Sequence, residues 1–237
     1  MKKRWVIPDV HGHAKTLRSL VEEQIRPARY DEIYLLGDYI DRGPDSKGVI
    51  DYIRHLQKDE FTVIALKGNH EDIMVDLYEA EVADKNPWYT AFFNRKRRSW
   101  FEMGGKTTLD SFKTKNLKDV PPDYIAWMKD LQYYVSLEDF VLVHAGLNFK
   151  NEDPFADQLS MLWIRDYDIK PEMISNRRII HGHVPVNIEL IDISRKNKYY
   201  KFIDLDNGIY IRDIEGFGNL VALELNSMEI FIQDNRD

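Results

Sequence analysis

The interpretation of this sequence depends above all on one stretch, Gly37-Asp38-Tyr39-Ile40-Asp41-Arg42-Gly43. It directly follows a short apolar run, residues 33–36, of the length and composition typical of a buried strand. In open α/β sheets, the loops beyond the carboxyl ends of parallel strands meet in the ligand-binding crevice. The stretch therefore places two carboxylates and a guanidinium where such proteins bind their ligands.

Four further polar clusters follow predicted strands in the same way. These strands cover residues 5–10, 62–66, 140–143 and 178–180, and helical patterns over residues 14–25 and 46–56 separate the first three strands of the chain. Each cluster alone is a weak signal, because an isolated histidine is more often a core residue than a ligand. Five clusters in chain order argue against coincidence. The four are Asp9-Val10-His11-Gly12, Gly68-Asn69-His70-Glu71, His144-Ala145-Gly146 and His181-Gly182-His183-Val184-Pro185.

The side chains in these clusters are suited to binding metal ions. They offer nitrogen and oxygen ligands without sulfur, a set that suits manganese, iron or zinc better than calcium. Asp9 and Asp38 would repel each other in a dry crevice unless cations lay between them. The chain has no cysteine, which excludes disulfides, thiolate metal sites and a cysteine nucleophile.

The order of the five clusters, from Asp9 to His183, resembles that of the phosphoprotein phosphatase family in its bacterial and phage-type form. The stretch at residues 37–43 is the most specific part of the match. The resemblance implies a calcineurin-like metallophosphoesterase fold of the α/β class, a sandwich of mixed β-sheets flanked by helices. It also implies two divalent metal ions, with manganese preferred and iron or zinc as alternatives.

The resemblance assigns ligands position by position. One ion would be held by Asp9, His11 and Asp38, and the other by Asp38, Asn69, His144 and His183. Asp38 would bridge the two ions. Two divalent cations carry four positive charges and the two carboxylates remove two, so the centre retains charge for a bridging hydroxide and a phosphate.

The resemblance also implies roles for four residues that do not bind metal. His70 would protonate the leaving alkoxide as general acid, and Asp41 would orient its ring. Arg42 and Arg165 resemble the paired phosphate clamp of the family. A planar guanidinium can bind two phosphate oxygens at once, which a lysine cannot do.

The substrate is expected to be a phosphorylated protein or a small phosphoester. Phosphoserine and phosphothreonine are the first choice, with phosphotyrosine as a further option. Symmetrical diadenosine tetraphosphate hydrolases share the core and are the alternative, although the intact Asp41-Arg42 pair favours a protein phosphatase. A phospho-binding scaffold without activity is a third hypothesis, which the complete ligand set argues against.

Single residues argue against several other types of metal site. Purple acid phosphatases have a tyrosine where this chain has Asp41, and the metallo-β-lactamase motif would need other residues after His13. Pro185 stands where other two-metal relatives have another histidine, so the first metal should keep solvent ligands. His13 and His181 are interpreted as structural residues.

The chain is interpreted as one domain, residues 1–237, with a helical insertion at approximately 72–137 packed over one edge of the sheet. Helical patterns cover residues 72–80, 88–101 and 123–131. Within them, the basic run 95–98 is interpreted as a solvated face rather than a substrate patch, and Trp88, Trp100 and Trp127 as core residues.

Strands are also predicted at residues 199–205, 209–214, 220–225 and 229–233, with a hairpin turn at Asn207-Gly208, so the carboxyl third should form an antiparallel sheet.

Net charge and hydropathy limit the possible location and binding partners of the protein. The formal net charge of -7 argues against a nucleic-acid-binding protein, because such domains usually carry a basic excess. The apolar run that begins at Trp5 is too short for a signal peptide, and no segment approaches membrane-spanning length. We therefore expect a cytoplasmic protein without membrane partners.

Overall fold

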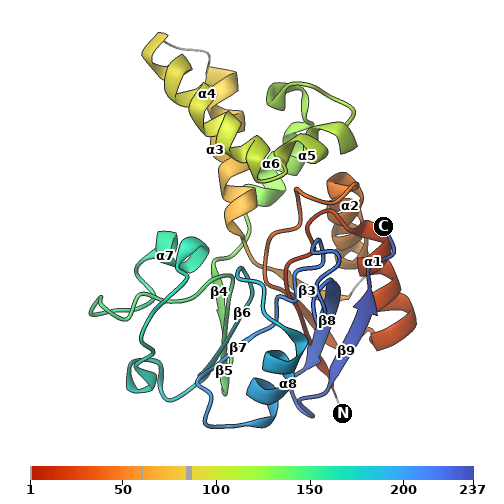
Figure 1. Cartoon of the computed structure of the whole chain (residues 1–237), viewed down its shortest axis with the longest axis vertical. Helices are drawn as coiled ribbons and strands as arrows, with labels where there is room; N and C mark the ends of the chain where they lie inside the picture. Colours follow the sequence, from red (N-terminus) through yellow and green to blue (C-terminus); the bar gives the residue numbers. More distant parts are fainter. Residues whose placement is uncertain (1, 60, 84–86) are drawn as a thin grey trace.

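Two mixed β-sheets form the centre of the molecule (Figure 1). The computed structural model describes residues 2–59, 61–83 and 87–237, and it describes the side chains of these residues except those of 87–92. One sheet has the strand order β3-β2-β1-β8-β9 and the other β4-β5-β6-β7. The strands are β1 (Arg4–Ile7), β2 (Glu32–Leu35), β3 (Thr62–Ala65), β4 (Tyr134–Ser136), β5 (Phe140–Val143), β6 (Arg178–His181), β7 (Phe202–Asp204), β8 (Asn219–Glu224) and β9 (Ile230–Asp234).

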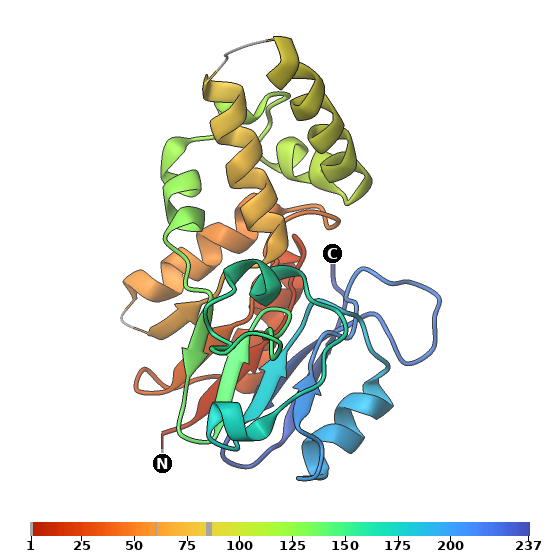
Figure 2. The same cartoon turned by 90° about the vertical axis from the view of Figure 1, so that its left-hand side faces the viewer.

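Helices flank both sheets and extend beyond one end of them (Figures 1 and 2). The α-helices are α1 (Ala14–Ser19), α2 (Ser46–Lys58), α3 (Asn69–Ala83), α4 (Pro87–Glu102), α5 (Gly105–Ser111), α6 (Pro122–Lys129), α7 (Gln158–Trp163) and α8 (Ile188–Lys196). Shorter or irregular turns are a π-helical segment η1 (Leu20–Ile25) and two 3-10 segments, η2 (Leu117–Asp119) and η3 (Pro171–Ile174). This is the expected sandwich of mixed sheets with flanking helices.

The alternation of side chains along the strands explains the layers. Val6 of β1 lies in the cluster between the two sheets, together with Leu142 of β5 and Leu223 of β8. Its neighbours Trp5 and Ile7 point the other way, into the cluster shared with α1 and α2. Because both faces of β1 are buried, the strand is apolar from Trp5 to Ile7, after the partly buried Arg4.

Parallel pairing brings the predicted polar clusters to one end of the sandwich. β1 pairs in parallel with β2, and β2 with β3. In the second sheet, β5 pairs in parallel with β6, and β6 with β7. The loops that follow β1, β2, β3, β5 and β6 therefore all leave the sheets at their carboxyl ends.

Helices α3 to α6 occupy the predicted insertion, between β3 and β4. They stand above the carboxyl end of β3 rather than over a sheet edge (Figures 1 and 2). Trp100 is fully buried and Trp127 packs partly buried against the core, as predicted, whereas Trp88 lies outside the described side chains. In the basic run, Arg95 and Arg98 are exposed. That the whole chain forms one domain stays a prediction.

The carboxyl third differs from the prediction in two respects. β7 pairs in parallel with β6, so only β8 and β9 extend the structure by antiparallel pairing, with β8 also antiparallel to β1. The strand predicted at residues 209–214 is wrong, because residues 205–218 form a loop. Gly208 has a φ of 64°, and Asn207 ties the loop to Val186 and Gly216 by side-chain hydrogen bonds instead of starting a hairpin.

Within the described part of the chain, no helix combines the length and the hydrophobicity needed to cross a membrane.

Candidate functional site

The loops after β1 and β2 are bound to each other through their backbones. The N–H groups of Val10 and His11 both donate to the carbonyl oxygen of Asp38, at 3.0 and 2.8 Å. Half of the ten predicted site residues have a positive φ, between 44° and 75°, a region that costs non-glycine residues about 1–3 kcal/mol each. The surrounding contacts hold this strained backbone in place. The five residues are His11, Asp38, Asp41, Arg42 and His183.

Asp38 lies at the centre of a ring of histidines. Its Oδ2 is 3.8 Å from Nε2 of His11, 3.8 Å from Nε2 of His70 and 3.5 Å from Nε2 of His144. Burial raises the pKa of Asp38, but the surrounding histidines, His144 first, outweigh it and bring the pKa below its usual value. Asp38 is therefore an ionised, buried acceptor in the position expected of a bridging ligand.

The orientation of two histidines suits metal binding. His11 Nδ1 lies 3.0 Å from the carbonyl oxygen of Ile40, and His144 Nδ1 lies 3.1 Å from that of Leu36. A proton on Nδ1 donates to each carbonyl and leaves the Nε2 lone pair directed at the centre. Burial lowers the pKa of both rings, which keeps them in the neutral form that a metal requires.

The second predicted ligand group is assembled in the structure. Ligand atoms of Asp38, His144 and His183 lie within 4.8 Å of one another, and Asn69 Oδ1 is 2.9 Å from His144 Nε2. The Nε2 atom of His183 is buried without a hydrogen-bond partner, and burial lowers the pKa of this ring to about 3. A buried imidazole nitrogen without a partner is costly in a protein, and a cation would satisfy it.

The first predicted group is also brought together, with one difference. Ligand atoms of His11 and Asp38 cluster with those of His70. Asp9 lies at the margin of this group, with Oδ2 4.0 Å from His11 Nε2. Burial, followed by the charges of Asp206 and Asp38, raises the pKa of Asp9 well above its usual value. This repulsion is the conflict that a cation would resolve, so the donor set fits two metal ions.

His70 and Asp41 form a buried pair. His70 Nδ1 lies 2.6 Å from Asp41 Oδ2, which leaves Nε2 facing the centre. Burial lowers the pKa of His70, but the charges of Asp38 and Asp41 raise it to about 9. The hydrogen bond to Asp41 fixes the ring so that a proton on Nε2 would point to the centre.

The insertion supplies the other partners of Asp41. Trp100 of α4 donates its Nε1–H to Asp41 Oδ2 at 2.8 Å, and Thr108 of α5 donates its hydroxyl to Oδ1 at 2.5 Å. Trp100 was expected only to fill the core, and Thr108 was missed. Nothing in the sequence near either residue indicates that it would reach Asp41, because the contact depends on how the helices pack.

Glu71 fixes the loops around Asp38. It is fully buried, and its carboxylate accepts hydrogen bonds from the backbone N–H groups of Asp38, Tyr39 and Gly68. Burial and the charge of Asp38 raise its pKa to about 8. Gly68 is needed for a steric reason, since a Cβ atom there would overlap Asp38 Oδ1. The cluster Gly68-Asn69-His70-Glu71 thus both positions the loops around the site and supplies side chains to it.

Arg42 and Arg165 are exposed. After the larger effect of burial, the charge of Arg42 contributes to lowering the pKa of His11, and that of Arg165 contributes to lowering the pKa of His183. Among the described residues, neither arginine has a carboxylate within salt-bridge distance. Arg42 stacks 3.8 Å from the ring centroid of Tyr210, in the loop 205–218. Sequence reasoning missed Tyr210 because it placed that residue in a strand.

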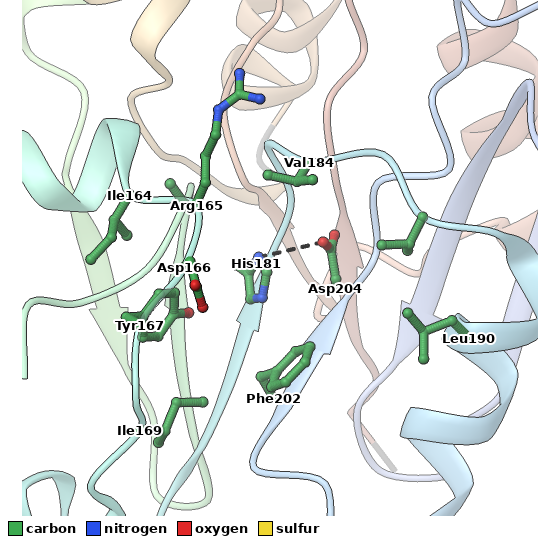
Figure 3. A pocket seen from close by; sticks show the side chains of 12 residues that line it. Ile164, Arg165, Asp166, Tyr167, Ile169, His181, Val184, Leu190, Phe202 and Asp204 are labelled. Atoms are coloured by element: carbon green, nitrogen blue, oxygen red, sulfur yellow. Dashed lines mark ion pairs between the residues drawn. The ribbon is translucent and has the colours of Figure 1, made fainter.

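A cavity of about 250 Å³ opens beside Arg165 (Figure 3). Tyr167, Phe202 and Leu190 contribute to its apolar walls, and His181 and Asp204 face each other within it, with His181 Nδ1 3.9 Å from Asp204 Oδ2. Burial lowers the pKa of His181 to about 4, so its ring is neutral. The interpretation of His13 and His181 as structural residues stays a prediction.

The family model described as calcineurin-like phosphoesterase matches residues 2–187 of the chain. The chain belongs to the calcineurin-like phosphoesterase family. Its curated relatives include bacterial proteins named serine/threonine-protein phosphatase. The predicted resemblance is confirmed at this level.

Curated relatives of this phosphoesterase carry two kinds of name. Over 84 residues it is 36% identical to serine/threonine-protein phosphatase 2 of Escherichia coli (strain K12), covering 35% of each chain. Over 146 residues it is 24% identical to the symmetrical bis(5'-nucleosyl)-tetraphosphatase of Vibrio campbellii, covering 61% of this chain and 44% of that protein. The phosphoesterase thus spans less than half the length of each of these relatives.

Solved structures support the fold over the whole chain. A serine/threonine phosphatase of Saccharomyces cerevisiae superposes with a TM-score of 0.64 at 14% identity, covering 100% of this phosphoesterase and 81% of that chain. A cold-active protein-tyrosine phosphatase of a Shewanella species superposes with a TM-score of 0.60 at 16% identity, covering 98% and 80%. At these identities the likeness concerns the fold alone.

Proposed function

We propose that this phosphoesterase removes phosphate from phosphoserine and phosphothreonine residues of proteins, with two manganese ions in its centre. The observation that carries the proposal is the buried pair of His70 and Asp41, with Nδ1 and Oδ2 2.6 Å apart. Iron or zinc would satisfy the same set of nitrogen and oxygen ligands, and manganese is the first choice because of the resemblance to the phosphoprotein phosphatase family.

Two ligand groups around Asp38 would hold the ions. Asp9, His11 and Asp38 would hold the first, and Asp38, Asn69, His144 and His183 would hold the second. Bound ions would lower the pKa of a water molecule and stabilise negative charge on the phosphoryl oxygens. The unpartnered Nε2 of His183 and the mutual repulsion of Asp9 and Asp38 support this assignment.

Arg42 and Arg165 bind the phosphoryl group from two sides. Each guanidinium can donate two hydrogen bonds to phosphate oxygens, which fixes the orientation of the group for in-line attack. The stacking of Arg42 on Tyr210 supports this role, because it limits the directions in which an exposed arginine can point.

His70 donates a proton to the departing oxygen of the serine or threonine side chain. An alkoxide is a very basic leaving group, so protonation in the transition state contributes on the order of 10²–10⁴-fold. Asp41 holds the proton donor in place, and the bonds from Trp100 and Thr108 hold Asp41. A leaving group of low basicity would gain little from such an arrangement.

The alternative is hydrolysis of symmetrical dinucleoside tetraphosphates, as the names of several relatives suggest. Cleavage of a phosphoanhydride releases a nucleotide, a less basic leaving group than an alkoxide. The well-supported acid pair therefore favours the phosphomonoester. A scaffold without activity is disfavoured because none of the predicted ligands is missing.

One assay separates the three functions. Turnover is measured side by side with manganese on phosphoserine, phosphothreonine and phosphotyrosine peptides and on diadenosine tetraphosphate. We expect the highest kcat/KM on the first two peptides. A higher value on the dinucleotide would establish the alternative, and no turnover of any substrate by the metal-loaded protein would support a scaffold.

A further inference from the structure

The cavity of about 250 Å³ described above has no role in the proposed function, and it lies on the outer face of the second sheet. Ile180 of β6 and Ile203 of β7 point into the cluster between the two sheets. Side chains alternate along a strand, so the neighbouring His181 and Phe202 point to the other face. Both line the cavity, together with side chains from the segment 164–169 (Figure 3).

The cavity adjoins the candidate metal centre. Arg165, the proposed phosphate ligand, is one of its lining residues. Ala145 and Val184 also line it, and each directly follows a predicted metal ligand, His144 and His183 respectively. Consecutive Cα atoms are about 3.8 Å apart, so the cavity begins within one residue of the second ligand group.

The walls of the cavity are mostly apolar and include three rings. The ring centroids of Phe202 and His181 lie 5.5 Å apart, and those of Tyr167 and His181 lie 6.4 Å apart. Leu190 of α8 lines the cavity on the side away from Tyr167 (Figure 3). Aromatic rings favour neighbours at centroid distances of about 4.5–7 Å, so a further ring would pack well here.

One polar group in the cavity lacks a partner. The hydroxyl of Tyr167 is buried and makes no hydrogen bond to any described residue. The ring reaches from one wall toward His181, and a Cβ atom at Gly146 would overlap it (Figure 3). Oδ2 of Asp204 also faces the cavity, and its distance of 3.9 Å from His181 Nδ1 is too long for a hydrogen bond. A ligand hydroxyl therefore has two candidate partners in this cavity.

The volume of the cavity limits the kind of ligand. Pockets that hold a drug-sized molecule measure about 300–1,000 Å³, whereas this one measures about 250 Å³. It has room for one large side chain rather than for a whole nucleotide. An apolar body with a polar tip is the chemistry of a tyrosine side chain, whose hydroxyl usually finds a partner when it is buried.

We propose that this cavity receives an aromatic side chain of the substrate protein, tyrosine by preference, from a residue within two positions of the phosphorylated one. The inference rests on the proposed function, because it assumes a protein substrate whose phosphate lies against Arg165. Two residues of extended chain span about 7 Å at most, so only a close neighbour of the phosphorylated residue reaches the cavity. The cavity thus gives the phosphoesterase a preference among phosphorylated sequences that the metal ions and the arginines do not supply.

The test measures kcat/KM on phosphoserine peptides that differ at one position. Tyrosine, phenylalanine or alanine is placed at each position within two residues of the phosphoserine, with manganese present. At one of these positions we expect the tyrosine peptide to exceed the alanine peptide by about 10- to 200-fold, the range that a single group in an apolar pocket provides. The phenylalanine peptide should lie between them. Equal kcat/KM values for the three peptides at every position would overturn the inference.

Two variants show whether the preference comes from this cavity. Leu190→Trp fills it from α8, and Ile193→Trp adds the same ring to the same helix at an exposed position outside the cavity. The advantage of the tyrosine peptide over the alanine peptide should be lost in the first variant and kept in the second. Because the comparison uses two substrates on one preparation, a partly unfolded variant does not distort it. A wild-type advantage in Leu190→Trp, or an equal loss in Ile193→Trp, would overturn the inference.

Tyr167→Phe removes only the unpartnered hydroxyl and keeps the ring. In this variant kcat/KM for the tyrosine peptide should fall to that for the phenylalanine peptide, while the advantage of phenylalanine over alanine stays. An unchanged advantage of tyrosine over phenylalanine would overturn the assignment of the Tyr167 hydroxyl as the partner of the ligand.

A failure of this inference can be told apart from a failure of the proposed function. Turnover of the alanine peptides by wild type supports the proposed function, whatever the flanking residue contributes. If diadenosine tetraphosphate is instead hydrolysed faster than every peptide, and Leu190→Trp slows its hydrolysis, the cavity holds a base of the dinucleotide. Both the inference and the proposed function would then be wrong.

Discussion

The amino-terminal and carboxyl-terminal halves of the candidate centre are held in different ways. Around Asp38 and Asp41, protein groups hold the site: three backbone N–H groups donate to Glu71, and Trp100 and Thr108 donate to Asp41. On the opposite side, His183 Nε2 and Asp206 Oδ2 are buried and have no hydrogen-bond partner among the described residues.

This difference suggests a division of labour between protein and metal. The half that contains the proton donor is fixed by the protein itself, so its geometry should persist without metal. The half that contains His183 has buried polar atoms for which the described residues supply no partner and which a cation would satisfy, so its order should depend on the metal. Four experiments test whether the two halves differ in this way.

The largest effect is expected in the protein-fixed half, from His70→Asn. The variant should keep both metal ions and lose about 10²–10⁴-fold in kcat on a phosphoserine peptide, with little change in KM. The loss should be much smaller on nitrophenyl phosphate, whose leaving group hardly needs a proton. Metal analysis of the purified variant is the control.

If His70→Asn contains fewer than two ions, or is damaged equally on both substrates, His70 is not the acid that protonates the leaving group, and a loss of metal would make it a metal ligand. Its Nε2 clusters with His11 and Asp38, so the structure permits either role. The protein-fixed half would then also depend on metal, and the comparison would fail.

Removing the metal tests the other half directly. Chelation should lower the melting temperature, and manganese at 100 times its dissociation constant should restore about 2.7 kcal/mol of unfolding free energy. Hydrogen exchange should rise on chelation in residues 181–186 and stay low in residues 37–41. An equal change in hydrogen exchange in both segments would contradict the division of labour between protein and metal.

Trp100→Phe removes one donor from Asp41 while keeping an aromatic ring in the core. The lost bond to a charged acceptor should cost about 1.5–3 kcal/mol in urea unfolding. Trp127→Phe is the matched control, because the indole N–H of Trp127 donates an exposed 3.4 Å hydrogen bond to Gln57 and not to a site residue. The first variant, and not the second, should also lower kcat on the phosphoserine peptide.

The smallest effect is expected from Arg165→Lys, beside the metal-dependent half. Lysine keeps the charge but donates to phosphate as a point charge, so kcat/KM on a small aryl phosphate should fall roughly tenfold, the value of one lost hydrogen bond. A kcat/KM equal to that of wild type would remove Arg165 from the clamp and leave Arg42 alone on the phosphate.

The parts of the site that the sequence predicted are those encoded locally. Asp9, Asp38 and Asn69 each stand at a fixed distance from the end of an apolar run, so strand position and residue type were enough to bring them together. The same holds for His144 after β5 and His183 after β6. The alternation of apolar runs and helical patterns predicted the parallel α/β start of the chain, and the sandwich of two mixed sheets followed from the resemblance to the family.

The parts that escaped prediction depend on distant packing. Thr108 reaches Asp41 across 67 residues, and no short-range pattern encodes that contact. Asp206 and Tyr210 were not predicted near the site because the β-branched and aromatic residues at 209–214 resemble a strand. In the structure, the Asn207 side chain and the positive φ of Gly208 direct the chain into a loop. Local propensity was overridden there by tertiary hydrogen bonds.

The distance along the chain between Asp41 and its partners also bears on the order in which the protein matures. During synthesis, Asp41 emerges long before Trp100 and Thr108, which lie 59 and 67 residues downstream. Domains generally fold as units, and β1 pairs with β8 near the other end of the chain. The sheet that carries Asp9 and the helices that support Asp41 are therefore both completed late, after most of the chain has left the ribosome.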